Sequence, residues 1–199
     1  NGELFNGNIR NMNTSIEEFM NQGGTFGTKY IYDQLDRIIK MDSFQGIDDI
    51  KNSWKINNIG VANAYNSEYS YDANGNILRL NRKTEIGSPL DDLTYNYILD
   101  KNQLEYVQDA AGVKNNDIGN QTPNNYTYDA IGNLITDKSE DITNIHWNIY
   151  GKIMKIDKSG GDLSFSYDPR GNRIKKETID KIFWYVRDAS GNIMAIYRL

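Results

Sequence analysis

Aromatic and polar residues alternate along most of this chain, in short runs of the kind that forms half-buried β-strands. In six of these runs two aromatic residues stand two positions apart, and this period places both rings on one face of a strand. We therefore predict a series of strands that each have an aromatic face and a polar face. The pairs are Tyr30 and Tyr32, Tyr69 and Tyr71, Tyr95 and Tyr97, Tyr126 and Tyr128, Phe165 and Tyr167, and Phe183 and Tyr185.

A turn-forming motif follows these strands and repeats through the chain. It consists of Asp or Asn, two variable residues and Gly, often followed by Asn. From Asp129 onward it recurs after steps of 19, 20 and 20 residues. Weaker copies that start at Tyr30 and Tyr95 bring the number of copies to seven. The residues that define the turns are Asp72, Gly75, Asn76, Asp129, Gly132, Asn133, Asn148, Gly151, Asp168, Gly171, Asp188 and Gly191.

Each copy has the sequence pattern of a β-hairpin. The Asp side chain can accept hydrogen bonds from backbone N–H groups just ahead of it, and Gly adopts the positive φ that the turn needs. A single hairpin is marginally stable in water, whereas stacked hairpins bury a continuous core. The sequence therefore predicts an all-β fold in which repeated antiparallel hairpins form one extended sheet, curved because strands twist.

The repeat also suggests how the chain is organised. We expect residues 1–199 to be a single repeat segment of a longer protein, because the chain begins with Asn1 and ends within a predicted strand. Residues 1–28 are an irregular lead-in that includes a hairpin, and residues 29–199 hold about seven hairpins with loop insertions.

Four segments lie outside the regular pattern. Asn6-Gly7 predicts a tight hairpin turn in the lead-in. Residues 15–20 begin with a capping-box pattern and fit either a loop or one short helix. Residues 43–63 and 111–125 are rich in Asn, Gly and Asp, and are predicted to be loops between hairpins.

The composition narrows the classes of function. The net charge of −5 and the pI of about 4.9 argue against nucleic-acid binding, which needs a basic face. No apolar stretch approaches the roughly 20 residues that span a bilayer. The lack of cysteine excludes disulfides, thiol catalysis and Cys-ligated zinc. Only 38% of the residues are hydrophobic but 14 are Tyr, so we expect a core built from tyrosine more than from leucine.

The Asp-rich turns do not have the spacing of a calcium site. Gly75 is the fourth residue of its turn, whereas an EF-hand loop has Gly at the sixth position, and Lys83 stands where the bidentate Glu is needed. The third position is Asn74 in one copy and Ile131 in another, which a set of ion ligands would not tolerate. Turn formation is the better explanation, and we predict no metal site and no cofactor.

No catalytic group stands out either. His146 is the only histidine, so it has no second His or Cys for metal binding and is interpreted as a residue of the sheet surface. Adjacent acids at Glu17-Glu18, Asp48-Asp49 and Asp91-Asp92 could supply two carboxylates for glycoside hydrolysis. Such pairs in turn-rich segments are usually solvated, and we predict no catalytic residue.

The paired rings form a predicted aromatic ladder that has two interpretations. Exposed rings on a flat sheet can stack on sugars, whereas buried rings form a core. Pairing in every copy favours the core, because a binding platform needs aromatic residues only where the ligand lies. The ladder residues are Tyr32, Tyr69, Tyr71, Tyr95, Tyr97, Tyr126, Tyr128, Phe165, Tyr167 and Tyr185.

Taken in series, these motifs resemble the YD repeats of the rearrangement hot spot (RHS) proteins, a family that includes insecticidal toxin-complex C subunits and animal teneurins. The resemblance covers nearly the whole chain. One such motif is a weak signal, whereas seven in series are specific. The phrases that carry it are NGNIRNM at residues 6–12, EYSYDANGNILRLNR at 68–82, IHWNIYGKIMKI at 145–156 and YVRDASGNIMAIY at 185–197.

The resemblance implies a long sheet that spirals into a hollow cocoon around the protein's own C-terminal region, which in bacterial members is usually a variable toxin domain. It also implies a protein that is secreted or displayed on the bacterial surface. The chain has no recognisable toxin sequence. Asp168-Pro169-Arg170-Gly171 resembles the self-cleavage site of RHS proteins, but it occupies a repeat turn in which Pro169 favours a structural role.

We therefore expect a structural, non-enzymatic part of an RHS-repeat shell that encloses and helps to deliver a toxin domain in bacterial competition. The expected partners are the remaining repeats and the C-terminal toxin domain of the same full-length chain, with export machinery and cell-surface glycans as further candidates. We expect no nucleic acid and no membrane span. The alternative is a cell-surface adhesion or glycan-binding module built on the same sheet.

Overall fold

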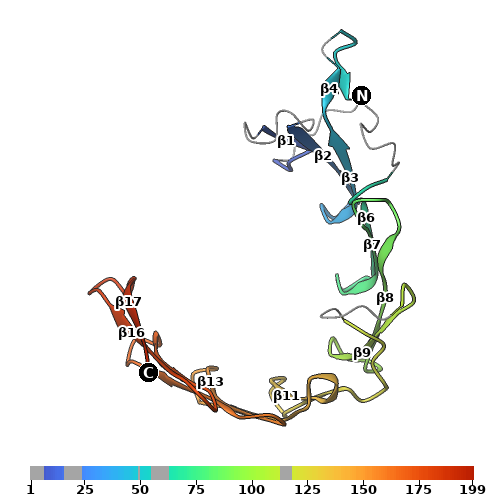
Figure 1. The fold of residues 1–199 in the computed structure, drawn as a ribbon. Coiled ribbons are helices and arrows are strands. Elements are labelled where there is room, and N and C mark those ends of the chain that lie inside the picture. Colours follow the sequence, from blue (N-terminus) through green and yellow to red (C-terminus); the bar gives the residue numbers. More distant parts are fainter. Residues whose placement is uncertain (1–6, 16–23, 49, 55–62, 113–117) are drawn as a thin grey trace. The chain divides into compact units, whose positions relative to one another are not determined.

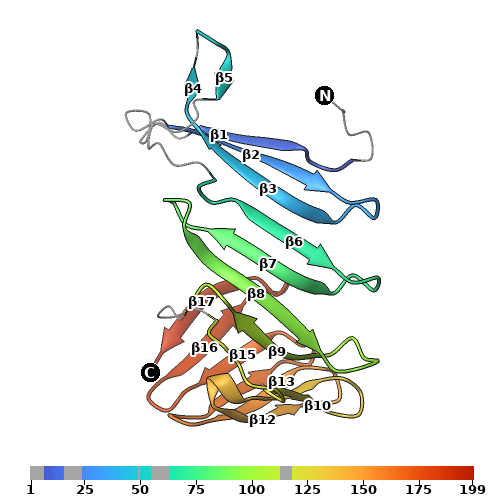
Figure 2. The same ribbon diagram turned by 90° about the vertical axis from the view of Figure 1, so that its right-hand side faces the viewer.

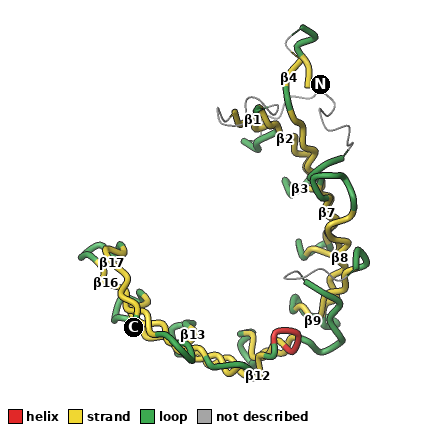
Figure 3. The backbone as a smooth tube through the Cα atoms, viewed as in Figure 1, coloured by secondary structure: helices red, strands yellow, loops and turns green. Residues whose placement is uncertain are grey.

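The computed structural model describes residues 7–15, 24–48, 50–54, 63–112 and 118–199 (Figure 1). These residues form antiparallel strands, with one 3₁₀ helix, η2 (Lys138–Glu140), and no α-helix among them (Figure 3). The chain divides into two compact units, the first of residues 1–102 and 107–120 and the second of residues 103–106 and 121–199. The predicted all-β fold of antiparallel hairpins is confirmed.

A seven-stranded sheet contains the first three hairpins. Its strands follow the order of the sequence, except that β4 and β5 form a separate ribbon, as Figure 2 shows for β1 to β8. The turns that join β2 to β3 and β6 to β7 lie at the same edge of the sheet. The order is β1 (Asn11–Ser15), β2 (Thr25–Tyr32), β3 (Ile38–Gln45), β6 (Ser67–Tyr71), β7 (Ile77–Lys83), β8 (Pro89–Tyr97) and β9 (Leu104–Asp109).

An eight-stranded sheet contains the last four hairpins. Each strand pairs with its neighbours in the sequence, so the sheet grows by one hairpin at a time. The order is β10 (Tyr126–Tyr128), β11 (Leu134–Asp137), β12 (Ile142–Trp147), β13 (Ile153–Lys158), β14 (Leu163–Tyr167), β15 (Arg173–Glu177), β16 (Ile182–Arg187) and β17 (Ile193–Arg198).

The arrangement differs from the sequence prediction in two respects. The strands form two large sheets, where the sequence predicts one. The strands of the two sheets are separated in the sequence by residues 110–125, which contain no strand where they are described. The segment 43–63, predicted to be a loop, contains the end of β3 and a short ribbon of β4 (Ile47–Asp48) and β5 (Ser53–Trp54). Asn6 and residues 16–20, where a turn and a loop or helix are predicted, lie outside the described residues.

Trp54, at the end of the ribbon, packs on the first sheet. Its ring stacks on Phe44 with ring centroids 5.8 Å apart. The ring also lies directly over Gly27, where an added Cβ atom would clash with it. Glycine on β2 therefore permits a close approach that the polar composition of residues 43–63 does not reveal.

The two faces of the first sheet differ in chemistry. On one face the register places Tyr69 opposite Leu80, and Leu80 opposite Leu93. On the other face Arg79 forms an ion pair with Asp92, and Lys40 forms one with Glu68. The sheet therefore has one mainly apolar face, which also holds the buried ion pair of Arg82 and Asp91, and one charged face, as alternation predicts.

Few apolar side chains are fully enclosed. Among the described residues the buried hydrophobic side chains are Leu93 and Val107 in the first unit and Ile145 in the second. The ladder residues are all half-buried. No helix in the described part of the chain is long and apolar enough to cross a membrane.

Candidate functional site

The repeated hairpin turn is held together by a clip between its first and fifth residues. In the turn that starts at Asp72, one carboxylate oxygen accepts the N–H groups of Asn74 and Asn76, at 2.9 and 2.8 Å. The other oxygen accepts the amide of the Asn76 side chain at 2.8 Å. Gly75 closes the turn with φ 92° and donates its N–H to the Asp72 carbonyl. Both side chains of the clip are therefore used within the turn.

The same clip occurs in the turns that start at Asp129, Asp168 and Asp188. In each, the Asp accepts two backbone N–H groups and the side-chain amide of the Asn four residues later. The glycines have positive φ: Gly132 93°, Gly171 81° and Gly191 93°. Asp168-Pro169 thus lies in a turn with the same hydrogen bonds as the others.

The clips make the stability of the hairpins depend on pH. Hydrogen bonds from the following Asn side chain, and then from backbone N–H groups, hold the pKa of Asp72, Asp168 and Asp188 below the ordinary value. A carboxyl group with a lowered folded-state pKa contributes stability above its unfolded pKa of about 3.9, and this contribution is lost as the pH falls through the folded-state pKa.

We expect the triple variant Asp72→Asn, Asp168→Asn and Asp188→Asn to lose less stability between pH 6 and pH 3 than the parent protein does. Asn148 indicates that asparagine is tolerated, because its side-chain oxygen accepts the N–H groups of Tyr150 and Lys152 in the same way. Urea unfolding at a series of pH values measures the difference. If the stability of parent and variant depends equally on pH, the clips are not the source of the pH dependence.

A β-bulge lies directly after the turn in six hairpins. In the hairpin of β6 and β7, for example, Ser70 pairs with Arg79 while Tyr71 pairs with Ile77, so that Leu78 is an extra residue. The same register shift occurs in the hairpins β2–β3, β10–β11, β12–β13, β14–β15 and β16–β17. A bulge interrupts the ladder of backbone hydrogen bonds and re-aims the neighbouring groups.

The residue directly before the turn links its hairpin to the preceding one. Tyr71 donates its hydroxyl to the carbonyl of Ile38 at 2.7 Å, and Tyr97 donates to Ile77 at 2.8 Å. Each of these two acceptors, Ile38 and Ile77, is the first residue of the strand that follows the preceding turn. We call this contact the linking bond. The others with a tyrosine donor are Tyr32 to Ile9, Tyr128 to Leu104 and Tyr167 to Ile153, at 2.6 to 2.9 Å.

Two hairpins make the linking bond with a different side chain. Trp147 donates its indole N–H to the carbonyl of Leu134 at 2.8 Å. Arg187 donates to the carbonyl of Arg173 at 3.1 and 3.2 Å. Tyr, Trp and Arg share a long side chain with a hydrogen-bond donor at its end. The position is therefore defined by this donor and not by an aromatic ring.

Sequence analysis did not identify Trp147 or Arg187 as members of the repeat site. A signal was present, since both stand directly before the first turn residue, where the other hairpins carry Tyr. It also missed Arg173, whose guanidinium lies 5.6 Å from the ring centre of Phe165 and 5.0 Å from that of Tyr185. Cation–π contacts of this kind add to the stability of a hairpin stack.

The acid pair Asp91-Asp92 is not solvated as predicted. The side chain of Asp91 is fully buried and forms an ion pair with Arg82, which lies opposite it across β7 and β8. Asp92 pairs with Arg79 on the other face. The backbone N–H of Asp92 donates to the buried carboxylate of Asp109 at 2.9 Å. Successive residues of a strand face opposite sides, so the two carboxylates have separate partners and do not converge as a catalytic pair.

His146 lies on the polar face of the second sheet. Its Nε2 is 2.7 Å from Asp157, and Lys155 forms ion pairs with Asp157 and Asp162. No group of His, Asp and Glu within the described residues has the arrangement of a metal site.

Comparison with solved structures finds the same kind of β-structure in a toxin complex. The chain matches part of the crystal structure of TcdB2-TccC3-TEV with a TM-score of 0.51 and 16% sequence identity, over 87% of this chain and 9% of that one. It also matches the Photorhabdus luminescens Tc holotoxin pore containing a TccC3 mutant, with a TM-score of 0.26 and 11% identity, over 89% of this chain and 15% of that one. No family model matches, and no curated protein matches in sequence.

The first match shows the fold alone, because the identity is low. The chain spans about a tenth of the matched chain's length. Its fold is that of an antiparallel β-segment found within a Tc toxin component.

Proposed function

We propose that this chain is a structural, non-enzymatic wall segment of an RHS-repeat shell, and that the shell encloses the C-terminal toxin domain of a secreted bacterial polymorphic toxin. The observation that carries the proposal is the linking bond. It recurs at successive hairpins in both units, so each hairpin docks on the preceding one by the same contact. A stack with one repeated nearest-neighbour contact can grow to any length, which is what a wall requires.

The chemistry of the two faces supports the same function. One face of the first sheet carries half-buried rings and apolar side chains, and the other carries most of the ion pairs, and a shell wall likewise has two surfaces in different environments. Five of the ladder tyrosines use their hydroxyls in linking bonds, so these rings hold the stack together and are not free to serve as a sugar-stacking platform. This argues for the wall over an adhesion module formed by the ladder.

The proposal is tested with the full-length protein that contains this chain. We expect its C-terminal region to resist a protease that cuts the same region rapidly when it is expressed alone. In the variant Tyr128→Phe with Tyr167→Phe, weakened linking bonds open the wall more often, and cleavage of the enclosed region becomes faster. Ser70→Ala, a change at an exposed position of a strand, is the control and leaves the cleavage rate unchanged. A C-terminal region cut equally fast in the full-length protein and alone would contradict enclosure.

A further inference from the structure

One turn of the second sheet departs from the others at both ends of its clip. Asn148 replaces the first Asp and Lys152 replaces the last Asn. The backbone hydrogen bonds are kept, since the Asn148 oxygen accepts two N–H groups, but its amide now points to the sulfur of Met154 at 3.7 Å. The ammonium of Lys152 forms no hydrogen bond or ion pair within the described chain. The double replacement therefore frees a cation that the clip does not use.

The tip of this turn is also unusual. Ile149 and Tyr150 are 92% and 79% exposed. In the other turns with a clip, these two positions hold Ala-Asn, Ala-Ile, Pro-Arg and Ala-Ser, so this is the turn of the five that presents an aromatic ring at its tip. An exposed tyrosine ring beside a free cation has no role in the hairpin itself.

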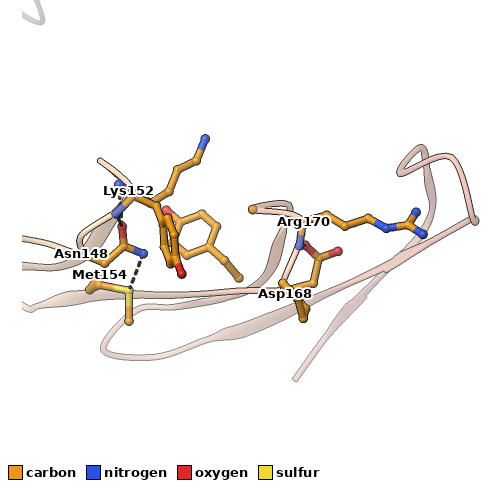
Figure 4. A pocket seen from close by; sticks show the side chains of 9 residues that line it. Asn148, Lys152, Met154, Asp168 and Arg170 are labelled. Carbon is orange, nitrogen blue, oxygen red and sulfur yellow. Dashed lines mark hydrogen bonds between the residues drawn. The ribbon is translucent and has the colours of Figure 1, made fainter.

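Tyr150 and Lys152 border a pocket of about 430 Å³ between this turn and the next one (Figure 4). Asn148, Lys152 and Met154 lie on one side, and Asp168 and Arg170 lie on the other, with Arg170 extending away from Lys152. The stem of Lys152 reaches the neighbouring turn, where it would lie 3.6 Å from a Cβ atom added at Gly171. The volume is within the range of small-molecule sites.

The charge of the lining favours an anion. Lys152 and Arg170 are cationic, and Asp168 is the one carboxylate. The Asp168 oxygens already accept the N–H groups of Arg170 and Asn172 and the Asn172 amide. Arg170 donates to the carbonyl of Ala189 at 2.6 Å, so Lys152 is the cation left to bind a ligand.

The backbone of the two turns cannot bind an extended peptide. Four of its N–H groups, those of Tyr150, Lys152, Arg170 and Asn172, are already donated to Asn148 or Asp168. Peptide binding by strand addition depends on free main-chain groups. Recognition here has to come from one charge and the flat face of a ring, which suits a compact cyclic anion.

We propose that this pocket binds an acidic sugar residue, with its carboxylate paired to Lys152 and its ring against Tyr150. Charge-assisted hydrogen bonds are among the stronger polar contacts, and an exposed tyrosine offers a large surface at low entropic cost. This inference does not depend on the wall function, because it concerns one pair of turns and the wall proposal concerns the repeated contact.

The test is an NMR titration of the 199-residue chain with tetragalacturonate, compared with neutral maltotetraose. We expect saturable shifts of the Tyr150, Lys152 and Gly171 amides with tetragalacturonate and none with maltotetraose. Lys152→Asn and Tyr150→Ser introduce residues that other turns carry at the same positions, so the variants are expected to fold. Each should weaken binding by about tenfold, the effect of losing one charged or stacking contact.

The matched control is Ile131→Ala, which changes the equivalent tip position of the preceding turn and should leave the affinity unchanged. Circular dichroism of every variant verifies that it is folded. The proposal is overturned by the absence of saturable shifts at millimolar tetragalacturonate, by equal affinity of Lys152→Asn and the parent, or by equally tight binding of a glutamate tetrapeptide. None of these results bears on the protease test of the wall.

Discussion

Replacing Arg82 by methionine is expected to lower the free energy of unfolding of the first unit by about 3 kcal/mol, the lower end of the range for breaking a buried ion pair. The carboxylate of Asp91 is fully buried opposite Arg82, whose side chain is 46% exposed. Methionine keeps the bulk of the arginine stem but removes the charge that compensates the buried carboxylate. Hydrogen exchange of the β7 and β8 amides in increasing urea measures the loss for this unit separately.

Two further variants separate the cause from general disruption. Arg82→Met combined with Asp91→Leu removes both charges and is expected to recover stability to within about 1 kcal/mol of the parent, since apolar replacement of a buried pair is often neutral. Arg79→Met breaks the more exposed pair with Asp92 on the other face and should cost at most about 1 kcal/mol. If Arg79→Met and Arg82→Met lower the free energy of unfolding by similar amounts, the burial of Asp91 does not set the size of the loss.

Removing four tyrosine hydroxyls that make linking bonds is expected to destabilise each unit by about 2 kcal/mol. The variant carries Tyr71→Phe and Tyr97→Phe in the first unit, and Tyr128→Phe and Tyr167→Phe in the second. Each change removes one hydrogen bond between hairpins, worth about 1 kcal/mol, and keeps the ring. The four sites make separate contacts, so their effects should add. Urea unfolding followed by hydrogen exchange gives the loss in each unit.

Tyr150→Phe is the control for loss of a hydroxyl as such. Its ring is 79% exposed at the tip of a turn, and no change in stability is expected. A quadruple variant as stable as Tyr150→Phe would mean that the linking bonds do not hold the hairpins together. In that case the repeated contact could not support the proposed wall.

The hairpins could be predicted from the sequence because their signals are local. Asp72, Gly75 and Asn76 lie within five residues, and their roles in the turn depend on backbone geometry that these residues determine themselves. The alternation of Tyr69, Ser70 and Tyr71 gives the face of the strand in the same way. These features need no knowledge of the rest of the molecule.

The contacts between hairpins could not be predicted in this way. The acceptor of the Tyr71 hydroxyl is 33 residues away, and it is a backbone carbonyl that any residue would supply. The role of the position is clear in the structure because Trp147 and Arg187 make the same bond as the tyrosines. Asp91 was misjudged for a related reason, because its burial depends on the pairing of β7 and β8 and not on its neighbours in the sequence.

By itself the sequence determined the fold class, the position of each repeat turn and the face on which each ladder ring lies. Turn formation and strand alternation are governed by neighbouring residues, so the linear pattern contains them. The tertiary structure decided how the hairpins join, which acid is buried, and where Lys152 and Tyr150 meet a pocket. These features depend on distances between residues that are far apart in the chain, and the strand register fixes those distances only once the sheets have formed.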